Sequence, residues 1–454
     1  MAYLIKEAKK EENEKKVSFR IGGVHPPQKK YLSKDRSIKT APTPEKVIIP
    51  LTQHIGRPST PCVEVGSTVK TGQVIGEISG FISVPTHASI SGIVKKIDKY
   101  PHPLGRNVLS VEIESDGKND FDTVLKPLEL DEISAENIID RIKDAGIVGL
   151  GGAAFPTHVK LLPPENKKID TVIINGAECE PYLTCDYRNM LENAADILQG
   201  LEIIMKVLGP ERGIIAVESN KLDAYKKIKD EIKNKASNIE LVLMDVKYPQ
   251  GAEKQLIDAV LKREVPSGGL PFDVGVIVQN VGTAIAIKDA LVDAKPLIER
   301  VVTLTGEGLR RTSNVRVKIG TLISDLIEQV GGMVPEAYKV IIGGPMMGIA
   351  QNSLNVPVVK GTSGIMVLTE EQAIECEYST CIRCGRCIRA CPMKLLPSTL
   401  GNIVEKEKIE YLEEYYIKDC IECGCCSYVC PAKRPLVQFM KYGKLAASQK
   451  GSNQ

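Results

Sequence analysis

The C-terminal part of the chain contains the stretch Cys381-Ile-Arg-Cys384-Gly-Arg-Cys387-Ile-Arg-Ala-Cys391-Pro392. The same spacing returns further on, at Cys420, Cys423, Cys426, Cys430 and Pro431. Each copy reads C-x2-C-x2-C-x3-C-P, in which three cysteines wrap one [4Fe–4S] cluster and the fourth ligates the other cluster. The two copies therefore predict one cluster held by Cys381, Cys384, Cys387 and Cys430. They predict a second cluster held by Cys420, Cys423, Cys426 and Cys391.

Two other uses of cysteine fit this stretch less well. A structural zinc site takes four ligands in two pairs, whereas these cysteines form two identical quartets that are followed by proline. A disulfide framework needs an oxidising compartment, and nothing in the sequence directs export. The pattern is that of a bacterial two-cluster ferredoxin. Cys376 and Cys425 fall outside the spacing, and we expect them to be structural, because free cysteine packs as a small apolar residue.

The composition is that of a soluble globular protein. The 454 residues are too many for one hydrophobic core, so we expect three or four domains. The formal net charge is only +2, from 59 basic and 57 acidic residues, which gives no support to a nucleic-acid partner or an anionic membrane. Most of the 13 cysteines lie between Cys376 and Cys430, which indicates a reducing compartment.

The sequence shows no export or membrane-spanning signal. The first residues, up to Lys16, mix Lys and Glu without the apolar core of a signal peptide, and we expect a mobile arm there. No window of about 18 residues is apolar and free of charge. We therefore expect no transmembrane segment in this chain; if the protein serves a membrane, it sits on the membrane rather than in it.

Residues 45–118 indicate a small all-β domain. Short β-branched runs between Lys46 and Glu114 alternate with Gly and Pro turns. The segment from Val65 to Gly76, followed by residues 85–94, resembles the biotinyl/lipoyl family of barrel-sandwich domains. In that family a lysine at one hairpin carries the cofactor, whereas the matching hairpin here is Ser79-Gly80-Phe81-Ile82-Ser83. The resemblance thus implies a barrel-sandwich hybrid without the modification.

A glycine-rich loop follows a predicted helix that begins after Ser134 and stops at Gly146. The loop contains Gly149, Gly151, Gly152, Phe155 and Lys160. Glycine lets backbone N–H groups approach a phosphate or a flat ring, and lysine supplies positive charge. The loop fits G-x-G-x-x-A, but a helix stands where the dinucleotide fingerprint needs a strand, and no Gly-Lys-Ser/Thr completes a Walker loop. The glycines alone leave a ligand loop and a plain turn equally open.

Residues 169–294 alternate predicted strands with predicted helices, which indicates a mostly parallel sheet. The predicted strands are 169–174, 213–217, 239–244 and 274–278. The predicted helices are 189–208, 222–235, 252–262 and 284–294. Polar and glycine residues follow at 175–180, 248–253 and 279–283. They would gather at the carboxyl edge of the sheet, where open α/β sheets bind nucleotides.

The glycine loop and these strand ends resemble the flavin and NADH pocket of the 51-kDa-type subunit of respiratory NADH dehydrogenase. The resemblance implies that non-covalent FMN is lined by Gly149, Gly151, Gly152 and Lys160 and contacted by Asn175 and Glu178. It implies that the nicotinamide nucleotide faces Phe155, Glu180 and Glu253, and it adds Gly251 and Asn280 to the cofactor-binding residues. Two positions depart from that family, since Leu150 replaces its usual arginine and Ala177 its usual aspartate. Phosphate contact from the loop must then come from the backbone and Lys160.

Residues 299–366 resemble the small ubiquitin-like SLBB module, and we expect the nearby pair Met346 and Met347 to be core. The expected ranges are an N-terminal arm at 1–44, the barrel sandwich at 45–118, an FMN/NADH-binding domain at 119–298, the SLBB module at 299–366, a two-cluster ferredoxin-like domain at 367–443 and a disordered tail at 444–454. The expected fold is therefore a multidomain α/β protein with additional β domains.

In this order the parts resemble the RnfC family, which belongs to the Rnf complexes, the ion-translocating ferredoxin:NAD⁺ oxidoreductases. The resemblance implies a peripheral component on the cytoplasmic face of the cell membrane that passes electrons between NAD(H), FMN and two [4Fe–4S] clusters. Its partners would be NADH or NAD⁺ and the other membrane and iron–sulfur subunits of the Rnf complex. No acid–base or nucleophilic catalytic residues are expected, because a flavin itself joins two-electron hydride transfer to one-electron cluster chemistry.

Two alternatives stay open at this point. A soluble reductase such as a cobalamin reductase combines the same parts, although its barrel sandwich typically follows the clusters. A chain that does not bind FMN would instead be a non-catalytic electron wire. The sequence also leaves the coupling ion open.

Overall fold

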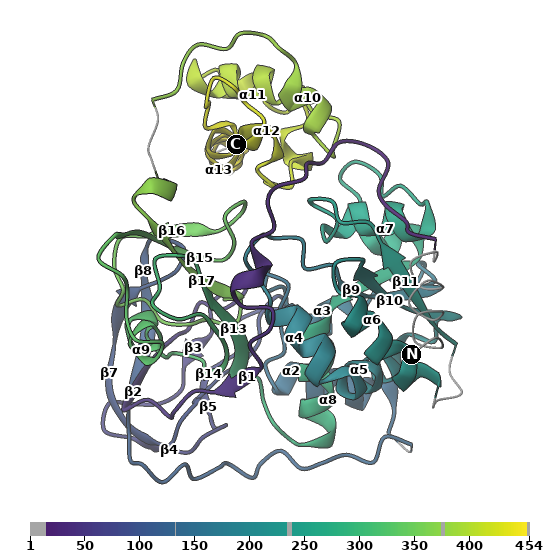
Figure 1. Cartoon of the computed structure of the whole chain (residues 1–454). Helices are drawn as coiled ribbons and strands as arrows, with labels where there is room; N and C mark the ends of the chain where they lie inside the picture. The colour runs from purple at the N-terminus through teal and green to yellow at the C-terminus, as the bar shows by residue number, and fades with distance from the viewer. Residues whose placement is uncertain (1–14, 132, 234–237, 374–376, 452–454) are drawn as a thin grey trace, which may run out of the picture.

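The computed structural model describes residues 15–131, 133–233, 238–373 and 377–451. Within these residues, the strands form four sheets. Helices surround the fully parallel sheet and also make up the C-terminal domain, which lies across the top of the molecule in Figure 1. The expected multidomain α/β fold with additional β domains is confirmed.

Two small sheets form the barrel sandwich, with strand orders β2-β8-β7-β4 and β3-β5-β6. The strands are β2 (Lys46–Pro50), β3 (Thr60–Pro61), β4 (Thr68–Val69), β5 (Val74–Glu77), β6 (Thr86–His87), β7 (Gly92–Pro101) and β8 (Asn107–Ser115). Both sheets contribute to one core, in which Val47 and Ile49 of β2 meet Ile75 of β5. Residues two apart share a face of a strand, which explains the alternating β-branched pattern of this segment.

The next sheet is parallel throughout, in the order β11-β10-β9-β12. Its strands are β9 (Thr171–Gly176), β10 (Arg212–Glu218), β11 (Ile239–Met244) and β12 (Val276–Asn280). Val172 and Ile174 of β9 enter the larger core on one face, whereas Ile173 enters a second core on the other face. A strand with apolar residues on both faces must be covered on both, and helices provide that cover.

The helices of this domain are α2 (Ala135–Asp144), α3 (Thr157–Lys160), α4 (Cys185–Glu192), α5 (Ala194–Leu208), α6 (Leu222–Lys233), α7 (Glu253–Leu261) and α8 (Val281–Val292). Apolar residues of α2, α5, α6 and α8 fill the larger core, and α7 covers the opposite face. The prediction of a single helix at 189–208 is wrong, because α4 ends at Glu192 and α5 begins at Ala194. The backbone leaves the helical conformation at Asn193, whose side chain donates to Asn189 Oδ1 over 3.1 Å, and two helices result.

The SLBB sheet has the order β1-β14-β13-β17-β15-β16. Its strands are β1 (Ile38–Thr40), β13 (Glu299–Thr305), β14 (Ser313–Lys318), β15 (Ala337–Ile342), β16 (Ile349–Gln351) and β17 (Gly364–Thr369), with α9 (Ile323–Gln329) packed beside them. Strand β1 pairs in parallel with β14, so part of the expected N-terminal arm belongs to this sheet. The expected domain boundary at residue 366 is also wrong, because it falls inside β17.

The C-terminal domain contains α10 (Arg386–Ala390), α11 (Pro397–Glu405), α12 (Cys425–Tyr428) and α13 (Leu436–Gly451). Short 3-10 helices lie at η1 (Lys30–Leu32), η2 (Pro271–Val274), η3 (Glu371–Ala373), η4 (Ile409–Tyr411) and η5 (Ile417–Asp419). The expected disorder from Lys444 is wrong for the described residues, because α13 continues to Gly451. Ala446 and Ala447 pack against the core of this domain, and Lys444 Nζ pairs with Glu422 Oε1 at 2.7 Å.

Residues 17–33, which we call the strap, cross the molecule with little regular structure before the short 3-10 helix η1. The amide of Val17 donates to Leu243 O at the end of β11, and that of Gly23 donates to Ala390 O of the C-terminal domain. Figure 1 shows the strap, in dark purple, running below that domain. It thereby joins parts far apart in sequence. The expected mobile arm to Lys16 lies almost wholly outside the described residues.

None of the helices described in the structure combines the length and apolar character needed to cross a bilayer.

Candidate functional site

The carboxyl edge of the parallel sheet brings together two of the segments that the sequence singled out. Asn175, near the end of β9, donates from Nδ2 to Gly251 O over 2.8 Å and accepts from Ala177 N over 3.0 Å. A Cβ atom at position 251 would lie 2.2 Å from Ala177 O, so only glycine permits this approach. Asn175 and Gly251 therefore fix the loop after β9 against the loop before α7.

The glycine loop lies beside the end of β12. Gly149 N donates to Phe155 O over 2.8 Å and closes the loop, and Gly151 packs against the side chain of Asn280. Gly152 has φ +112°, and a Cβ placed on it would meet no atom within 4 Å. The loop thus presents an open stretch of backbone at the carboxyl edge, which fits a phosphate or a flat ring.

Lys160 and Glu253 form an ion pair across this edge. Lys160 Nζ lies 2.5 Å from Glu253 Oε1, and their side chains are 27% and 35% exposed. Lys160 ends α3 and Glu253 begins α7. The structure therefore places a long cationic side chain and a carboxylate together where the sequence analysis expected flavin and nicotinamide contacts.

Glu178 is buried, and its carboxylate is occupied by the chain itself. Its Oε1 accepts from Asp186 N over 2.9 Å and its Oε2 from Tyr187 N over 3.3 Å, so it satisfies free N–H groups at the start of α4. Lys30 Nζ from the strap lies 3.7 Å from Oε2. The same ammonium donates to Leu183 O over 2.6 Å and to Glu180 O over 3.0 Å. Lys30 and Glu178 thus hold the loop that carries Glu180.

Glu180 lies between the parallel sheet and the SLBB module. Its Oε2 accepts from Met346 N over 3.1 Å, and its Oε1 is 3.4 Å from the hydroxyl of Tyr248. Burial raises the pKa of Glu180 to about 7, and these hydrogen bonds oppose the shift. The carboxyl is therefore poised to change charge near neutral pH.

This shift predicts a pH-dependent effect of Glu180→Gln on stability. The folded protein holds a proton on Glu180 up to about pH 7, whereas the ordinary value is 4.5. The folded state binds more protons in that window, so its stability falls as pH rises through it, by about 3 kcal/mol. The variant should therefore gain in melting temperature over the unaltered protein between about pH 5 and pH 8. Circular dichroism melts measure this, and the exposed Glu211→Gln is the control. A difference between Glu180→Gln and the unaltered protein that stays constant with pH would contradict the assignment.

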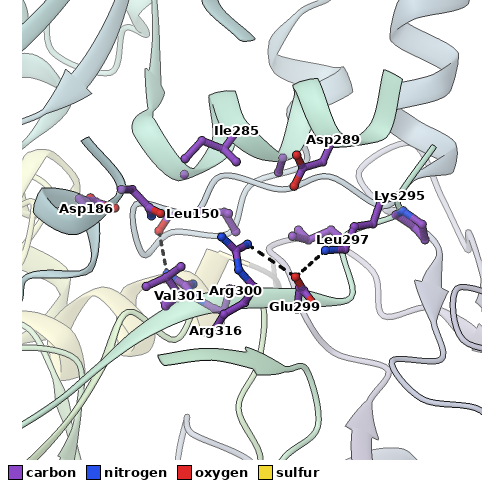
Figure 2. A pocket seen from close by; sticks show the side chains of 14 residues that line it. Leu150, Asp186, Ile285, Asp289, Lys295, Leu297, Glu299, Arg300, Val301 and Arg316 are labelled. Carbon is purple, nitrogen blue, oxygen red and sulfur yellow. Dashed lines mark hydrogen bonds and ion pairs between the residues drawn. The ribbon is translucent and has the colours of Figure 1, made fainter. Parts of the chain in front are cut away.

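A small pocket of about 40 Å³ lies behind the glycine loop, between α4, α8 and β13 (Figure 2). Leu150 and Asp186 line it, and the buried Arg300 of β13 reaches Leu150 O over 3.4 Å. Asn280 Nδ2 donates to Asp186 Oδ2 over 2.7 Å, whereas burial and the charge of Glu178 raise the pKa of Asp186. The guanidinium of Arg300 thus lies next to the backbone of Leu150. Leu150 occupies the position at which the 51-kDa-type subunits have an arginine.

The cysteines line two separate cavities. One has a volume of about 280 Å³, and its lining includes Cys381, Cys384, Cys387 and Cys430. The other is about 20 Å³ and is lined in part by Cys391, Cys420, Cys423 and Cys426. Each cavity therefore combines three cysteines of one motif with the fourth cysteine of the other. Among the described residues, no three His, Cys, Asp or Glu side chains are grouped to hold a single metal ion.

The two remaining cysteines of this region differ in what the structure shows. Cys425 is fully buried, lines the smaller cavity and lies with Sγ 3.9 Å from Tyr248 O. Cys376 lies outside the described residues.

Four family models match the chain. The RnfC barrel sandwich hybrid domain matches residues 17–118, and the Nuo51 FMN-binding domain matches residues 142–289. The SLBB domain matches residues 301–350, and the 4Fe-4S dicluster domain matches residues 380–433. The C subunit of the proton-translocating ferredoxin:NAD(+) oxidoreductase complex of Clostridium ljungdahlii is 49% identical over 427 residues, which cover 94% of this chain and 93% of the relative. The chain belongs to the RnfC family of ion-translocating oxidoreductase complexes.

Other members of the RnfC family are also similar along most of the chain. The C subunit of the Na(+)-translocating ferredoxin:NAD(+) oxidoreductase complex of Acetobacterium woodii is 47% identical over 435 residues, which cover 95% of this chain and 98% of the relative. Because these two relatives are named for different ions, membership leaves the coupling ion open. A solved NAD+-reducing [NiFe]-hydrogenase in the H2-reduced state shares 16% identity at a TM-score of 0.49, over 71% of this chain and 67% of its own, and is too distant to bear on function.

Membership in the RnfC family confirms several predictions. The predicted cofactors are FMN, two [4Fe–4S] clusters and NAD(H), and the matched FMN-binding and dicluster domains support them. The chain is an electron-transfer component of an oxidoreductase complex. The open Gly152 backbone can approach a phosphate or a flat ring, and each cysteine quartet supplies the four thiolates that a [4Fe–4S] cluster takes.

Three residues of the site received no role from the sequence. Lys30 follows two prolines in an extended segment, where no periodicity points to burial. Arg300 follows Glu299 at the start of the run Val-Val-Thr-Leu at 301–304, and a buried charge in such a place is a signal of a specific partner. Tyr248 belongs to the segment 248–253, which the sequence analysis placed at the carboxyl edge of the sheet. Its position could therefore have indicated a contact with the site.

Proposed function

We propose that this chain exchanges electrons with NAD(H) at the carboxyl edge of the parallel sheet and passes them singly through the two cysteine quartets. The observation that carries the proposal is the joining of these two regions by Tyr248. Its backbone belongs to the loop before α7, and its hydroxyl donates to Cys423 O over 2.8 Å. The carboxyl edge of the parallel sheet and the loop that carries Cys423 are therefore in direct contact.

The chain's own residues supply binding and positioning. FMN, when bound, supplies the conversion of a hydride's two electrons into single electrons. The exposed backbone of Gly151 and Gly152 would receive its phosphate or ring, while Gly149 closes the loop behind them. Asn175, Gly251 and Asn280 hold the surrounding loops in place, and Glu178 orders α4 beneath them. Phe155, Glu180 and Glu253 would face the nicotinamide nucleotide.

Lys160 would supply the positive charge for the FMN phosphate. In the present structure its ammonium pairs with Glu253, and an anionic ligand at the loop would compete for it. Lys160→Met should therefore lower the FMN content of purified protein and weaken rebinding of added FMN, because a methionine keeps the length of the side chain without its charge. Flavin fluorescence after release measures the content, and the exposed Lys168→Met is the control. Equal flavin content in both variants would remove Lys160 from the site.

The eight cysteines would ligate the clusters in crossed sets. One [4Fe–4S] cluster would be held by Cys381, Cys384, Cys387 and Cys430, and the larger cavity that these four residues line supports this set. The other would be held by Cys391, Cys420, Cys423 and Cys426, which line the smaller cavity. Cys425 would not be a cluster ligand, because its buried sulfur packs against Val24 and Tyr248.

We place the protein on the cytoplasmic face of the membrane, where NAD(H) is available, in contact with the other subunits of the complex. The relatives' names, which describe ion-translocating complexes, support this placement.

One assay tests the function against its alternatives. Oxygen-free protein is given NADH and an artificial one-electron acceptor, and flavin, iron and sulfide are measured in the same preparation. We expect turnover with bound flavin. An absence of both flavin and turnover would leave an electron wire, and co-purification with a soluble cobalamin enzyme in place of membrane subunits would favour a soluble reductase.

A further inference from the structure

Two buried cations of the SLBB module lie behind the glycine loop. Lys360, between β16 and β17, is 1% exposed, and its Nζ donates to Gly146 O over 2.7 Å. Arg300 of β13 is 6% exposed, and its Nη2 donates to Leu150 O over 3.4 Å. Arg300 also donates from Nη1 to Lys360 O, so the two residues form one connected unit. This unit holds one carbonyl group just before the loop and another within it.

The stability of the fold does not by itself account for Lys360. Among the described residues its ammonium has only carbonyl partners, since besides Gly146 O it donates to Pro85 O of the barrel sandwich over 3.2 Å. Burial lowers the pKa of this lysine to about 7. An apolar side chain of the same length would avoid the cost of burying the charge. The role of Lys360 therefore lies in the backbone that it holds, at the junction of three domains.

The other end of the loop is held in the same way. Ile55 N, from the barrel sandwich, donates to Ala154 O over 3.3 Å. Gly361 follows Lys360 and lies against the middle of the loop, because a Cβ atom placed on it would be 3.4 Å from Gly152 O. The loop is thus seated between two domains that are remote from it in sequence.

These contacts determine which side of the loop faces a ligand. In a planar trans peptide the C=O group and the following N–H group point in opposite directions. Leu150 O faces Arg300, so the N–H group of Gly151 faces away from it. Within the hydrogen bonds of the described residues, the N–H groups of Gly151 and Gly152 have no acceptor in the chain. The loop therefore presents these donors outward.

We propose that Arg300 and Lys360 are positioning residues of the cofactor site, which orient the backbone N–H groups of the glycine loop toward the flavin. The site is then complete only when the SLBB module and the barrel sandwich are docked on the parallel-sheet domain. This inference rests on the proposed function, in which the loop receives FMN. It gives the SLBB module a part in flavin binding through the loop that it holds.

Hydrogen–deuterium exchange of the flavin-free protein tests the positioning directly. Arg300→Met and Lys360→Met keep an unbranched side chain but remove its charge and its donors. The amides of Gly149 and Leu150 are protected, because they donate to Phe155 O and to Thr283 Oγ1. We expect the peptide 147–155 to exchange at least tenfold faster at these amides in both variants, while β9 exchanges as in the unaltered protein. Unchanged exchange in the loop would overturn the inference.

Titration of the flavin-free protein with FMN gives the second readout. We expect the dissociation constant of FMN to rise at least tenfold in Arg300→Met and in Lys360→Met. Arg300→Lys, which keeps a donor for Leu150 O, should recover part of the affinity. A purely structural role would lower the melting temperature and the iron content without changing the dissociation constant of the protein that remains folded.

Lys221→Met is the matched control, because Lys221 is buried to the same extent as Lys360. Its ammonium donates to Glu218 Oε2 over 2.7 Å and to Asn220 Oδ1 over 3.0 Å. The control should leave the dissociation constant of FMN unchanged, even where it lowers the melting temperature. An unchanged dissociation constant in Arg300→Met or Lys360→Met would overturn the inference, and so would an equal rise in Lys221→Met. An unaltered protein that binds no FMN would instead refute the proposed function.

Discussion

The double variant Cys391→Ser/Cys426→Ser is expected to retain one [4Fe–4S] cluster, whereas Cys391→Ser/Cys387→Ser is expected to lose both. Each pair removes two cysteines, but the first removes both from the quartet that lines the smaller cavity, whereas the second removes one from each quartet. The cavities that the quartets line, and not their order in the sequence, decide the outcome.

Iron and sulfide analysis of oxygen-free protein measures this result. The variant that retains one cluster should contain about four irons per chain. The variant that loses both clusters should contain almost no iron. Flavin content serves as the control for folding and should be the same in both variants. If Cys391→Ser/Cys387→Ser retained the cluster and Cys391→Ser/Cys426→Ser lost both, each motif would hold its own cluster and the crossed assignment would be wrong.

Lys30→Met is expected to destabilise the protein by about 3 kcal/mol or more, because it leaves Glu178 as a buried carboxylate without its cation. The side chains of the pair are 9% and 5% exposed, and the ammonium also donates to two backbone carbonyls. Burial lowers the pKa of Lys30, whereas Glu178 acts in the opposite direction and favours the charged form. The loss should appear as earlier unfolding in urea together with lower flavin content.

The neighbouring Lys29→Met is a matched control for this change. Lys29 pairs with Glu307 at 3.2 Å, but the side chains are 37% and 28% exposed, so its loss should cost less than about 1 kcal/mol. Adding Glu178→Gln to Lys30→Met should recover part of the stability, since the amide oxygen can still accept from the start of α4. Equal destabilisation by the two lysine variants would show that Lys30 does not carry the buried pair.

The parts of the fold that depend on local pattern could be predicted from the sequence. The cysteine spacing specifies two quartets within a short segment, and the runs of β9 to β12 are apolar on both faces, as a covered parallel sheet requires. The expected strand at 239–244 coincides with β11. Such features require only residues that are close in sequence.

The features that escaped prediction join residues far apart in the chain. Strand β1 pairs with β14, and neither its length nor its composition marks it as part of that sheet. The tail after Lys444 is small and polar, yet Ala446 and Ala447 of α13 pack against the core of the C-terminal domain. The family resemblance implied that Glu178 contacts FMN, and it could not indicate that the carboxylate also accepts from the start of α4 and lies beside Lys30.

The strap also constrains the time at which the protein can be completed during synthesis. Gly23 leaves the ribosome long before Ala390, which supplies its hydrogen-bond acceptor between two cysteines of the first motif. That acceptor exists only after the chain has been synthesised as far as Ala390, so the strap cannot take its final position before the first cysteine motif has emerged. Delivery of iron and sulfide to the newly made motif and the seating of the N-terminal segment therefore fall into the same late stage of assembly.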